Sequence, residues 1–394
     1  MKLASRLSFI EPFYVMECAK AAAEIAASPA CDPARGGERM IFLNIGEPDF
    51  TAPEPVQQAA ERAIRGGRTQ YTDAVGLPAL REAISRWYAQ RFGLDIPARR
   101  IVVTAGASAG LQLACLALFE AGDEVLMPDP SYPCNRHFVA AAEAVARLLP
   151  CPAEQRFQLD ADAVAKAWGP ATRGVLLASP SNPTGTSIHP DEMRRISQVV
   201  QAQGGVCVVD EIYLGLSFDD TYGHSALALG DHIVSVNSFS KYFSMTGWRL
   251  GWLVVPEALV SPIERLAQNL FICASSIAQH AALACFEPES ITEYERRRTE
   301  FAARRDLVVP ALNAMGLKVP VLPDGAFYAY ADCSAHHADS WDFSFELMHQ
   351  AHVALTPGRD FGRHDPERWL RLSYATSREQ LEQALHRLKR VLSG

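Results

Sequence analysis

Lys241 stands out chemically because of the residues around it. It follows the apolar run 233–237, with Ser238 and Ser240 beside it and Arg249 eight residues later. Burial at the end of a strand disfavours the ammonium form of a lysine and leaves an amine that can attack a carbonyl. Hydroxyl and guanidinium groups are typical ligands of a phosphate. An amine beside a phosphate site indicates pyridoxal phosphate held as a Schiff base, although most lysines are only solvated surface charges.

A second apolar run, 206–209, ends in the carboxylate of Asp210. Such a run is typical of a buried parallel strand, which would bring Asp210 to the sheet edge where ligands of α/β proteins collect. A carboxylate there can pair with a pyridinium N–H and keep the cofactor ring electron-withdrawing. Tyr213, three residues on, can donate to the phenolic oxygen of the ring. Two structural alternatives are open: a helix N-cap for Asp210 and a packing aromatic for Tyr213.

Two turns after further strand-like runs add polar groups to the same predicted edge. Asn182 follows the run 175–177 in a turn rich in Pro and Gly, between two prolines that would aim its amide. Residues 106–108 follow the run 101–104 and open a helix, whose first N–H groups and dipole suit a phosphate. The alternatives are an ordinary turn at Asn182 and a simple helix cap by Ser108.

Together these segments resemble the fold-type-I pyridoxal-phosphate enzymes, specifically the class I and II aminotransferases related to aspartate aminotransferase. The resemblance runs nearly end to end, and several ordered motifs at sensible spacing are far more specific than any one of them. The further motifs that carry it are 43–50 (LNIGEPDF), 70–72 (QYT), 76–81 (GLPALR), 104–108 (TAGAS) and 369–375 (WLRLSYA).

For the cofactor, the resemblance implies a cup around the phosphate and an aromatic ring stacked on the pyridine. The backbone amides of Ala107 and Ser108 would contact the phosphate, with Ser238 and Arg249 completing the cup. Tyr132 matches the position whose ring stacks on the cofactor. The structural alternatives are a surface ion pair for Arg249 and a loop-packing aromatic for Tyr132.

For the substrate and the subunits, the resemblance implies three further roles. Arg371 matches the residue that holds the substrate α-carboxylate, assisted by the Gly46 backbone and Asn182. A guanidinium grips a carboxylate with two parallel hydrogen bonds, which a lysine cannot imitate. Tyr71 matches the residue that reaches the phosphate of the neighbouring subunit, which implies a homodimer with shared active sites.

The activity that the resemblance implies is ping-pong transamination between an L-amino acid and a 2-oxo acid. Lys241 would release the cofactor to the amino acid and then move the Cα proton as general base and acid, while Asp210 keeps the ring an electron sink. One alternative is a lyase on the same scaffold, either a carbon–sulfur β-lyase or an aminocyclopropane-carboxylate-synthase-like enzyme. A cofactor-sensing regulator and a metal enzyme are less well supported. The chain starts almost directly at its first predicted helix, and it has no HExxH motif or Cys/His spacing, so we expect no metal site.

The preferred substrate stays open. A dicarboxylate substrate needs a second cation for its side-chain carboxylate, and no motif supplies one. Aromatic side chains at Phe13, Tyr14 and within 323–330 can line an apolar pocket or simply pack in the core. Aromatic, methionine, alanine and aspartate substrates therefore all remain candidates.

Length and composition agree with a two-domain cytoplasmic enzyme. The 394 residues exceed one compact core, and 48% of them are hydrophobic. A net charge of −8 without a basic run argues against a nucleic-acid or membrane surface. Nine cysteines without a CxxC pair are typical of reduced thiols. No targeting segment is evident, and no apolar run reaches the roughly 18 residues that a membrane span needs.

The alternating periodicities predict an α/β fold: a mostly parallel sheet of the seven-stranded type covered by helices, plus a smaller α+β domain. With the resemblance, this is the PLP-dependent transferase fold type I. We expect the large cofactor-binding domain at 46–285, and a small domain made of 1–45 and 286–394. Strands are predicted at 101–104, 124–127, 174–177, 206–209, 233–236 and 252–255. Helices are predicted at 19–30, 53–66, 77–92, 108–119, 133–143, 289–314 and 378–392.

Overall fold

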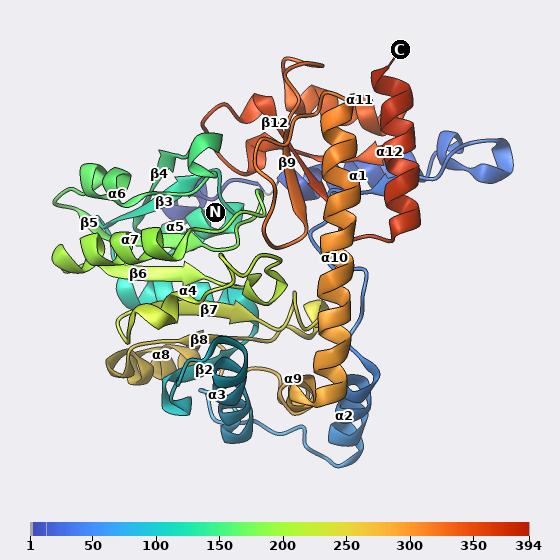
Figure 1. Cartoon of the computed structure of the whole chain (residues 1–394). Coiled ribbons are helices and arrows are strands. Elements are labelled where there is room, and N and C mark those ends of the chain that lie inside the picture. The colour runs from blue at the N-terminus through green and yellow to red at the C-terminus, as the bar shows by residue number, and fades with distance from the viewer. Residues whose placement is uncertain (1–2, 13, 394) are drawn as a thin grey trace.

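A seven-stranded sheet lies at the centre of the computed structural model, which describes residues 3–12 and 14–393 (Figure 1). Its strand order is β2-β8-β7-β6-β5-β3-β4, and every pairing is parallel except the two made by β8. The strands are β2 (Ile101–Thr104), β3 (Glu124–Asp129), β4 (Val145–Pro150), β5 (Thr172–Ala178), β6 (Val206–Asp210), β7 (Val234–Ser238) and β8 (Gly251–Val254).

Alternate residues along the strands of this sheet enter two separate hydrophobic clusters. In β6, Val208 belongs to one cluster, whereas Cys207 and Val209 belong to the other. Both faces of the sheet are therefore buried, which explains why its strands appear in the sequence as continuous apolar runs. The helices that cover the faces are α3 (Pro78–Phe92), α4 (Gly106–Leu118), α5 (Pro133–Ala141), α6 (Ala161–Ala167), α7 (Pro190–Ala202) and α8 (Glu257–Leu270).

A second, smaller group of elements combines the two ends of the chain. Near the N-terminus, β1 (Ile41–Phe42) pairs in parallel with β10 (Val353–Ala354). Next to them is an antiparallel sheet of order β11-β12-β9, with β9 at Tyr328–Asp332, β11 at Thr356–Pro357 and β12 at Trp369–Ser373. The accompanying helices are α1 (Tyr14–Ala26), α11 (Ser340–Gln350) and α12 (Arg378–Leu392).

Helix α10 (Pro288–Ala314) runs along the whole molecule, from α2 (Glu54–Arg65) and α9 (Ser276–Ala282) at one end to α11 and α12 at the other (Figure 1). Near its start, Glu295 accepts a hydrogen bond from Tyr242 and pairs with Arg91 of α3. Farther along, Arg304 holds Asp49 with two hydrogen bonds of 2.9 and 3.1 Å. The helix thus contacts both the large sheet region and the loop that leads away from β1.

The predicted α/β class is confirmed, and each predicted strand overlaps an observed one. Several elements differ. Strand β4, at the edge of the large sheet, was not predicted, nor were helices α6, α7, α8, α9 and α11. Helix α1 begins at Tyr14 instead of near residue 19. Phe13, a candidate pocket residue, lies outside the described residues. Over residues 3–12 and 14–393, no helix combines the length and hydropathy needed to cross a membrane.

Candidate active site

The carboxyl ends of the parallel strands open into one cavity of about 470 Å³. This volume lies in the range typical of small-molecule sites. Its lining includes the predicted site residues of this chain except Tyr71: Gly46, Ala107, Ser108, Tyr132, Asn182, Asp210, Tyr213, Ser238, Lys241, Arg249 and Arg371. Residues far apart in the sequence are brought together because neighbouring parallel strands end at the same edge.

The amine of Lys241 lies at this edge, three residues beyond the end of β7. Its Nζ donates a 2.7 Å hydrogen bond to the carbonyl of Gly46, and the rings of Tyr213 and Phe327 lie 5.7 and 5.8 Å away. Burial lowers the pKa of Lys241 to about 8, against the opposing charge of Glu47. An appreciable fraction of this lysine is therefore a neutral amine close to pH 7.

The carboxylate of Asp210 ends β6 and is 3% exposed. It accepts a 3.2 Å hydrogen bond from the backbone of Ile212 and another from the side chain of Asn135. Burial raises the pKa of Asp210 to about 7. The hydrogen bonds to this carboxylate and the charge of Lys241 therefore do not fully offset the cost of burying its charged form. A protonated ring nitrogen would supply the missing partner, and the site fits pyridoxal phosphate in this respect.

The start of α4 offers a space that could hold an anion. Gly106 has a φ of +83°, and a Cβ at this position would lie 2.6 Å from Nη2 of Arg249. Arg249 itself has a φ of +54° and donates a 2.9 Å hydrogen bond to the carbonyl of Thr246. Ser238 Oγ accepts a 3.0 Å bond from the backbone of Ser240. The space at this point is bordered by the first N–H groups of α4, the guanidinium of Arg249 and the hydroxyl of Ser238. A side chain at position 106 would reduce this space, and the positive φ there also favours glycine.

Arg371, in β12, is 3% exposed and fixed on several sides. It donates to Asn182 Oδ1 at 2.9 Å, to the carbonyl of Asn44 at 2.6 Å and to Thr356 Oγ1 at 3.3 Å. The rings of Tyr328 and Phe361 lie 4.6 and 4.8 Å from the guanidinium carbon. Its Nε has no partner within the described residues. A rigid, buried guanidinium that lines the cavity fits a carboxylate ligand.

Tyr213 and Tyr328 share a 2.7 Å hydrogen bond between their hydroxyls. Burial, with the neighbouring Tyr328, raises the pKa of Tyr213 well above its usual value, so its hydroxyl stays protonated. Gly46 packs against Tyr328 so closely that any side chain there would collide with the phenol. Tyr132, at the start of α5, faces the same cavity.

Tyr71 lies apart from the cavity of its own chain and is 78% exposed. The loop that carries it is nevertheless anchored on both sides. Ser276 of α9 donates to the carbonyl of Gln70, and Gln279 donates to Thr72 Oγ1 at 3.0 Å. The exposed phenol is therefore presented by an ordered loop.

Sequence reasoning missed three residues that contact Asp210 or Arg371. Asn135 contacts Asp210, and Asn44 and Thr356 fix Arg371. Asn135 lies one helical turn after Tyr132, so its place on the first turn of α5 was a usable signal. Thr356 had none, because its contact is set by the pairing of β11 with β12.

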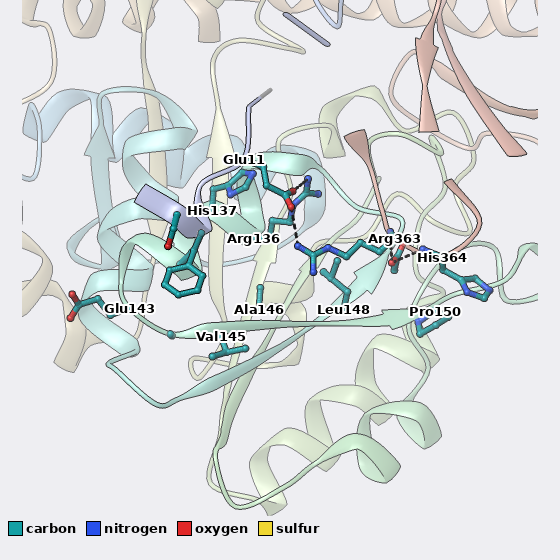
Figure 2. A pocket seen from close by; sticks show the side chains of 15 residues that line it. Glu11, Arg136, His137, Glu143, Val145, Ala146, Leu148, Pro150, Arg363 and His364 are labelled. Atoms are coloured by element: carbon teal, nitrogen blue, oxygen red, sulfur yellow. Dashed lines mark hydrogen bonds and ion pairs between the residues drawn. The ribbon is translucent and has the colours of Figure 1, made fainter. Parts of the chain in front are cut away.

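A second cavity, of about 770 Å³, lies beside β4, α5 and the N-terminal segment (Figure 2). Figure 2 shows Glu11 between Arg136 and Arg363 at this site. None of the predicted catalytic residues lines it. Among the residues that the structure describes, no group of three or more His, Cys, Asp or Glu side chains is placed to hold a metal ion.

Comparisons with known proteins agree with this site. The family model "Aminotransferase class I and II" matches residues 38–388. A valine–pyruvate aminotransferase from Mycobacterium tuberculosis is 38% identical over 380 residues, which is 96% of each chain. An aspartate aminotransferase from Pyrococcus horikoshii is 35% identical over 91% of this chain and 92% of that protein.

Solved structures give the same result. The crystal structure of an aminotransferase from Mycobacterium tuberculosis has a TM-score of 0.93 and 37% identity, covering 100% of this chain and 99% of the other. Aspartate aminotransferase from Thermus thermophilus, solved with maleate, has a TM-score of 0.90 and 31% identity, covering 99% and 100%. The chain belongs to the class I and II aminotransferases, enzymes that transfer amino groups with pyridoxal phosphate bound to a lysine.

Proposed function

We propose that Lys241 is the lysine that binds pyridoxal phosphate and moves the proton of a transamination reaction. One observation carries the proposal: the amine of Lys241, the carboxylate of Asp210 and the guanidinium of Arg371 line the same cavity. A base works best when its pKa lies near the working pH, and burial lowers that of Lys241 to about 8.

Four side chains would hold the ring of the cofactor. Asp210 would pair with the protonated ring nitrogen. This ion pair would stabilise the charged carboxylate, which burial otherwise disfavours. Tyr213 would donate its hydroxyl to the phenolic oxygen, with Asn182 nearby, and Tyr132 would lie against the ring. Each of these side chains lines the cavity, which supports the assignment.

Four further groups that line the cavity would hold the phosphate. These are the backbone amides of Ala107 and Ser108, the hydroxyl of Ser238 and the guanidinium of Arg249. Their support is the open space at Gly106 and the start of α4, where backbone N–H groups and the helix dipole favour an anion.

Arg371 would grip the substrate α-carboxylate, with Asn182 and the backbone of Gly46 completing the contact. Bound pyridoxal phosphate supplies an electron sink for the negative charge that develops at the substrate Cα. In the first half-reaction, Lys241 Nζ would take the proton from Cα of the amino acid and pass it to the cofactor. In the second, it would carry a proton back to the α-carbon of the incoming 2-oxo acid. The reaction is ping-pong because the first 2-oxo acid product would leave before the second substrate binds.

The first test is an absorbance spectrum of the purified protein with cofactor, recorded as single amino acids are added. We expect the visible band of the lysine-bound cofactor to fall as each productive amino acid donates its amino group, and to return when a 2-oxo acid is added. Accumulation of pyruvate, ammonia or a thiol without this reversal would indicate a lyase. No bound cofactor at all would refute the assignment of Lys241.

We further propose that the enzyme is a homodimer in which Tyr71 reaches the phosphate in the active site of the neighbouring subunit. The 78% exposure of Tyr71 on an anchored loop supports this role, because a large aromatic side chain is usually buried. A two-fold dimer would place the same loop at both sites.

Mixing two impaired variants tests this arrangement. We expect Tyr71→Ala to weaken cofactor binding by about 10- to 100-fold, the value of a hydrogen bond to a charged group. A random mixture of Tyr71→Ala and Lys241→Ala chains should regain about a quarter of wild-type activity at limiting cofactor, because half of the dimers contain one intact site. If Tyr71 served its own chain, no mixture would recover activity.

We propose a cytoplasmic location, which the nine free cysteines of the described structure support. The division into a large domain at 46–285 and a small domain made of 1–45 and 286–394 is likewise our proposal. It is supported by the pairing of β1 with β10, which joins the first segment to the last part of the chain.

A further inference from the structure

Part of the lining of the catalytic cavity is apolar and comes from the beginning of the chain. Val15, Met16 and Ala19 of α1 line it together with Ile45. Met16 is 62% exposed and Ile45 is 44% exposed. Large apolar side chains that remain exposed inside a concave ligand site mark a surface that a ligand covers. We call these four residues the α1 wall.

The α1 wall is held in place by charged groups of other elements. Asp360, which is fully buried, accepts hydrogen bonds of 3.1 and 2.6 Å from the first two N–H groups of α1. Arg136 of α5 donates to the carbonyl of Asp360 at 3.0 Å and to Glu11 at 3.2 Å. Glu11 also accepts from Arg363 at 3.1 Å (Figure 2). The apolar side chains of α1 are therefore anchored at the cavity and not loosely placed.

The cations that line the cavity are already assigned to other groups. Within the described residues, its basic side chains are Lys241, Arg249 and Arg371. They serve the reacting amine, the phosphate and the α-carboxylate. In the loop proposed to enter from the neighbouring subunit, the direct neighbours of Tyr71 are the uncharged Gln70 and Thr72, and the nearest cation is Arg68, three residues earlier. Among the residues that line the cavity, a second carboxylate on the substrate would thus have no unassigned basic partner, which is strongly unfavourable for a desolvated charge.

We propose that the α1 wall is the side-chain subsite and that the enzyme selects amino acids with uncharged, apolar side chains over dicarboxylic ones. This inference rests on the proposed function, since Arg371 and Lys241 must fix the α-carboxylate and Cα. With the α-carboxylate and Cα fixed, the side chain of the amino acid has to contact other parts of the cavity lining. The α1 wall offers it apolar surface and no charge.

The test is the rate of the first half-reaction with separate amino acids, followed by the visible absorbance of the bound cofactor. We expect kcat/KM for valine, leucine, methionine and phenylalanine to exceed that for aspartate and glutamate by roughly 100-fold or more. Equal or better use of aspartate would overturn the specificity while leaving the aminotransferase assignment intact. A cofactor band that responds to no amino acid would instead refute the proposed function.

A charge placed on the α1 wall should reverse part of this preference. We expect Met16→Arg to raise kcat/KM for glutamate or aspartate by about tenfold or more and to lower it for the apolar amino acids. Met16→Leu, which keeps the wall apolar, should retain the wild-type preference. Leu322→Arg is the matched control, because Leu322 is 54% exposed but outside the cavity.

The Leu322→Arg control distinguishes the effect of a charge inside the cavity from the effect of the protein's net charge. If Leu322→Arg shifts the preference as much as Met16→Arg, the effect is one of net charge and the subsite assignment is wrong. If Met16→Arg leaves the ratio of apolar to dicarboxylic substrates unchanged while it binds cofactor normally, the α1 wall does not contact the substrate side chain.

Discussion

Lys241→Ala is expected to reduce kcat for transamination by at least about 10⁴-fold, because it removes both the attaching amine and the proton-transfer base. No other lysine among the described residues lines the cavity, so no neighbour can replace it. The measurement is a single-turnover rate, together with the mass of the protein after borohydride reduction. Wild-type protein should keep the cofactor covalently on the peptide that contains residue 241, and the variant should not.

Two controls accompany this variant. Lys166→Ala removes an exposed lysine on α6 and should leave the rate unchanged. A small primary amine added to Lys241→Ala should restore part of the proton transfer, because the substitution leaves room for it in the cavity. A variant with wild-type turnover, or a reduced adduct on a different lysine, would show that another residue performs the chemistry.

Arg371→Lys should lower kcat/KM for the amino acid and for the 2-oxo acid by about 100- to 1000-fold each. An ammonium cannot make two parallel hydrogen bonds to a carboxylate while also replacing the bonds to Asn182 and Asn44. Cofactor absorbance should be unchanged, since the phosphate and ring contacts are made by other residues. Steady-state kinetics with both substrates would measure the effect.

Arg378→Lys is the corresponding control, because Arg378 forms an exposed ion pair with Glu382 on α12. Its kinetics should match the wild type. Equal losses in the two variants would point to a general effect of replacing arginine. If Arg371→Lys lost cofactor instead of substrate affinity, the assignment of Arg371 to the α-carboxylate would be wrong.

The positions of the catalytic groups could be predicted because each follows an apolar run that is buried on both faces of the sheet. Asp210 ends one such run and Lys241 lies three residues beyond the strand that contains another, and the parallel pairing of β6 and β7 places the strand ends together. The roles of Tyr71 and Arg371 rested on the resemblance alone. An exposed tyrosine and a strand arginine have no local signature of function.

Two misses have a physical reason. Strand β4 is an edge strand with side chains of mixed exposure, so its sequence lacks the continuous apolar run of its neighbours. Helix α1 starts earlier than predicted because its first N–H groups are satisfied by Asp360, a residue 345 positions away from Val15. A cap supplied from such a distance leaves no trace in the local sequence.

The length of α10 has a mechanical consequence for the enzyme. Its 27 residues form a rod of about 40 Å at the standard helical rise. Near one end it is bonded to Tyr242, the neighbour of Lys241, and toward the other it packs on β9, the strand paired with that of Arg371. A tilt of the rod by a small angle therefore moves its far end by a much larger displacement than its near end. Any change in the distance between the guanidinium of Arg371 and the amine of Lys241 that moved β9 relative to Tyr242 would therefore have to tilt or bend this one helix.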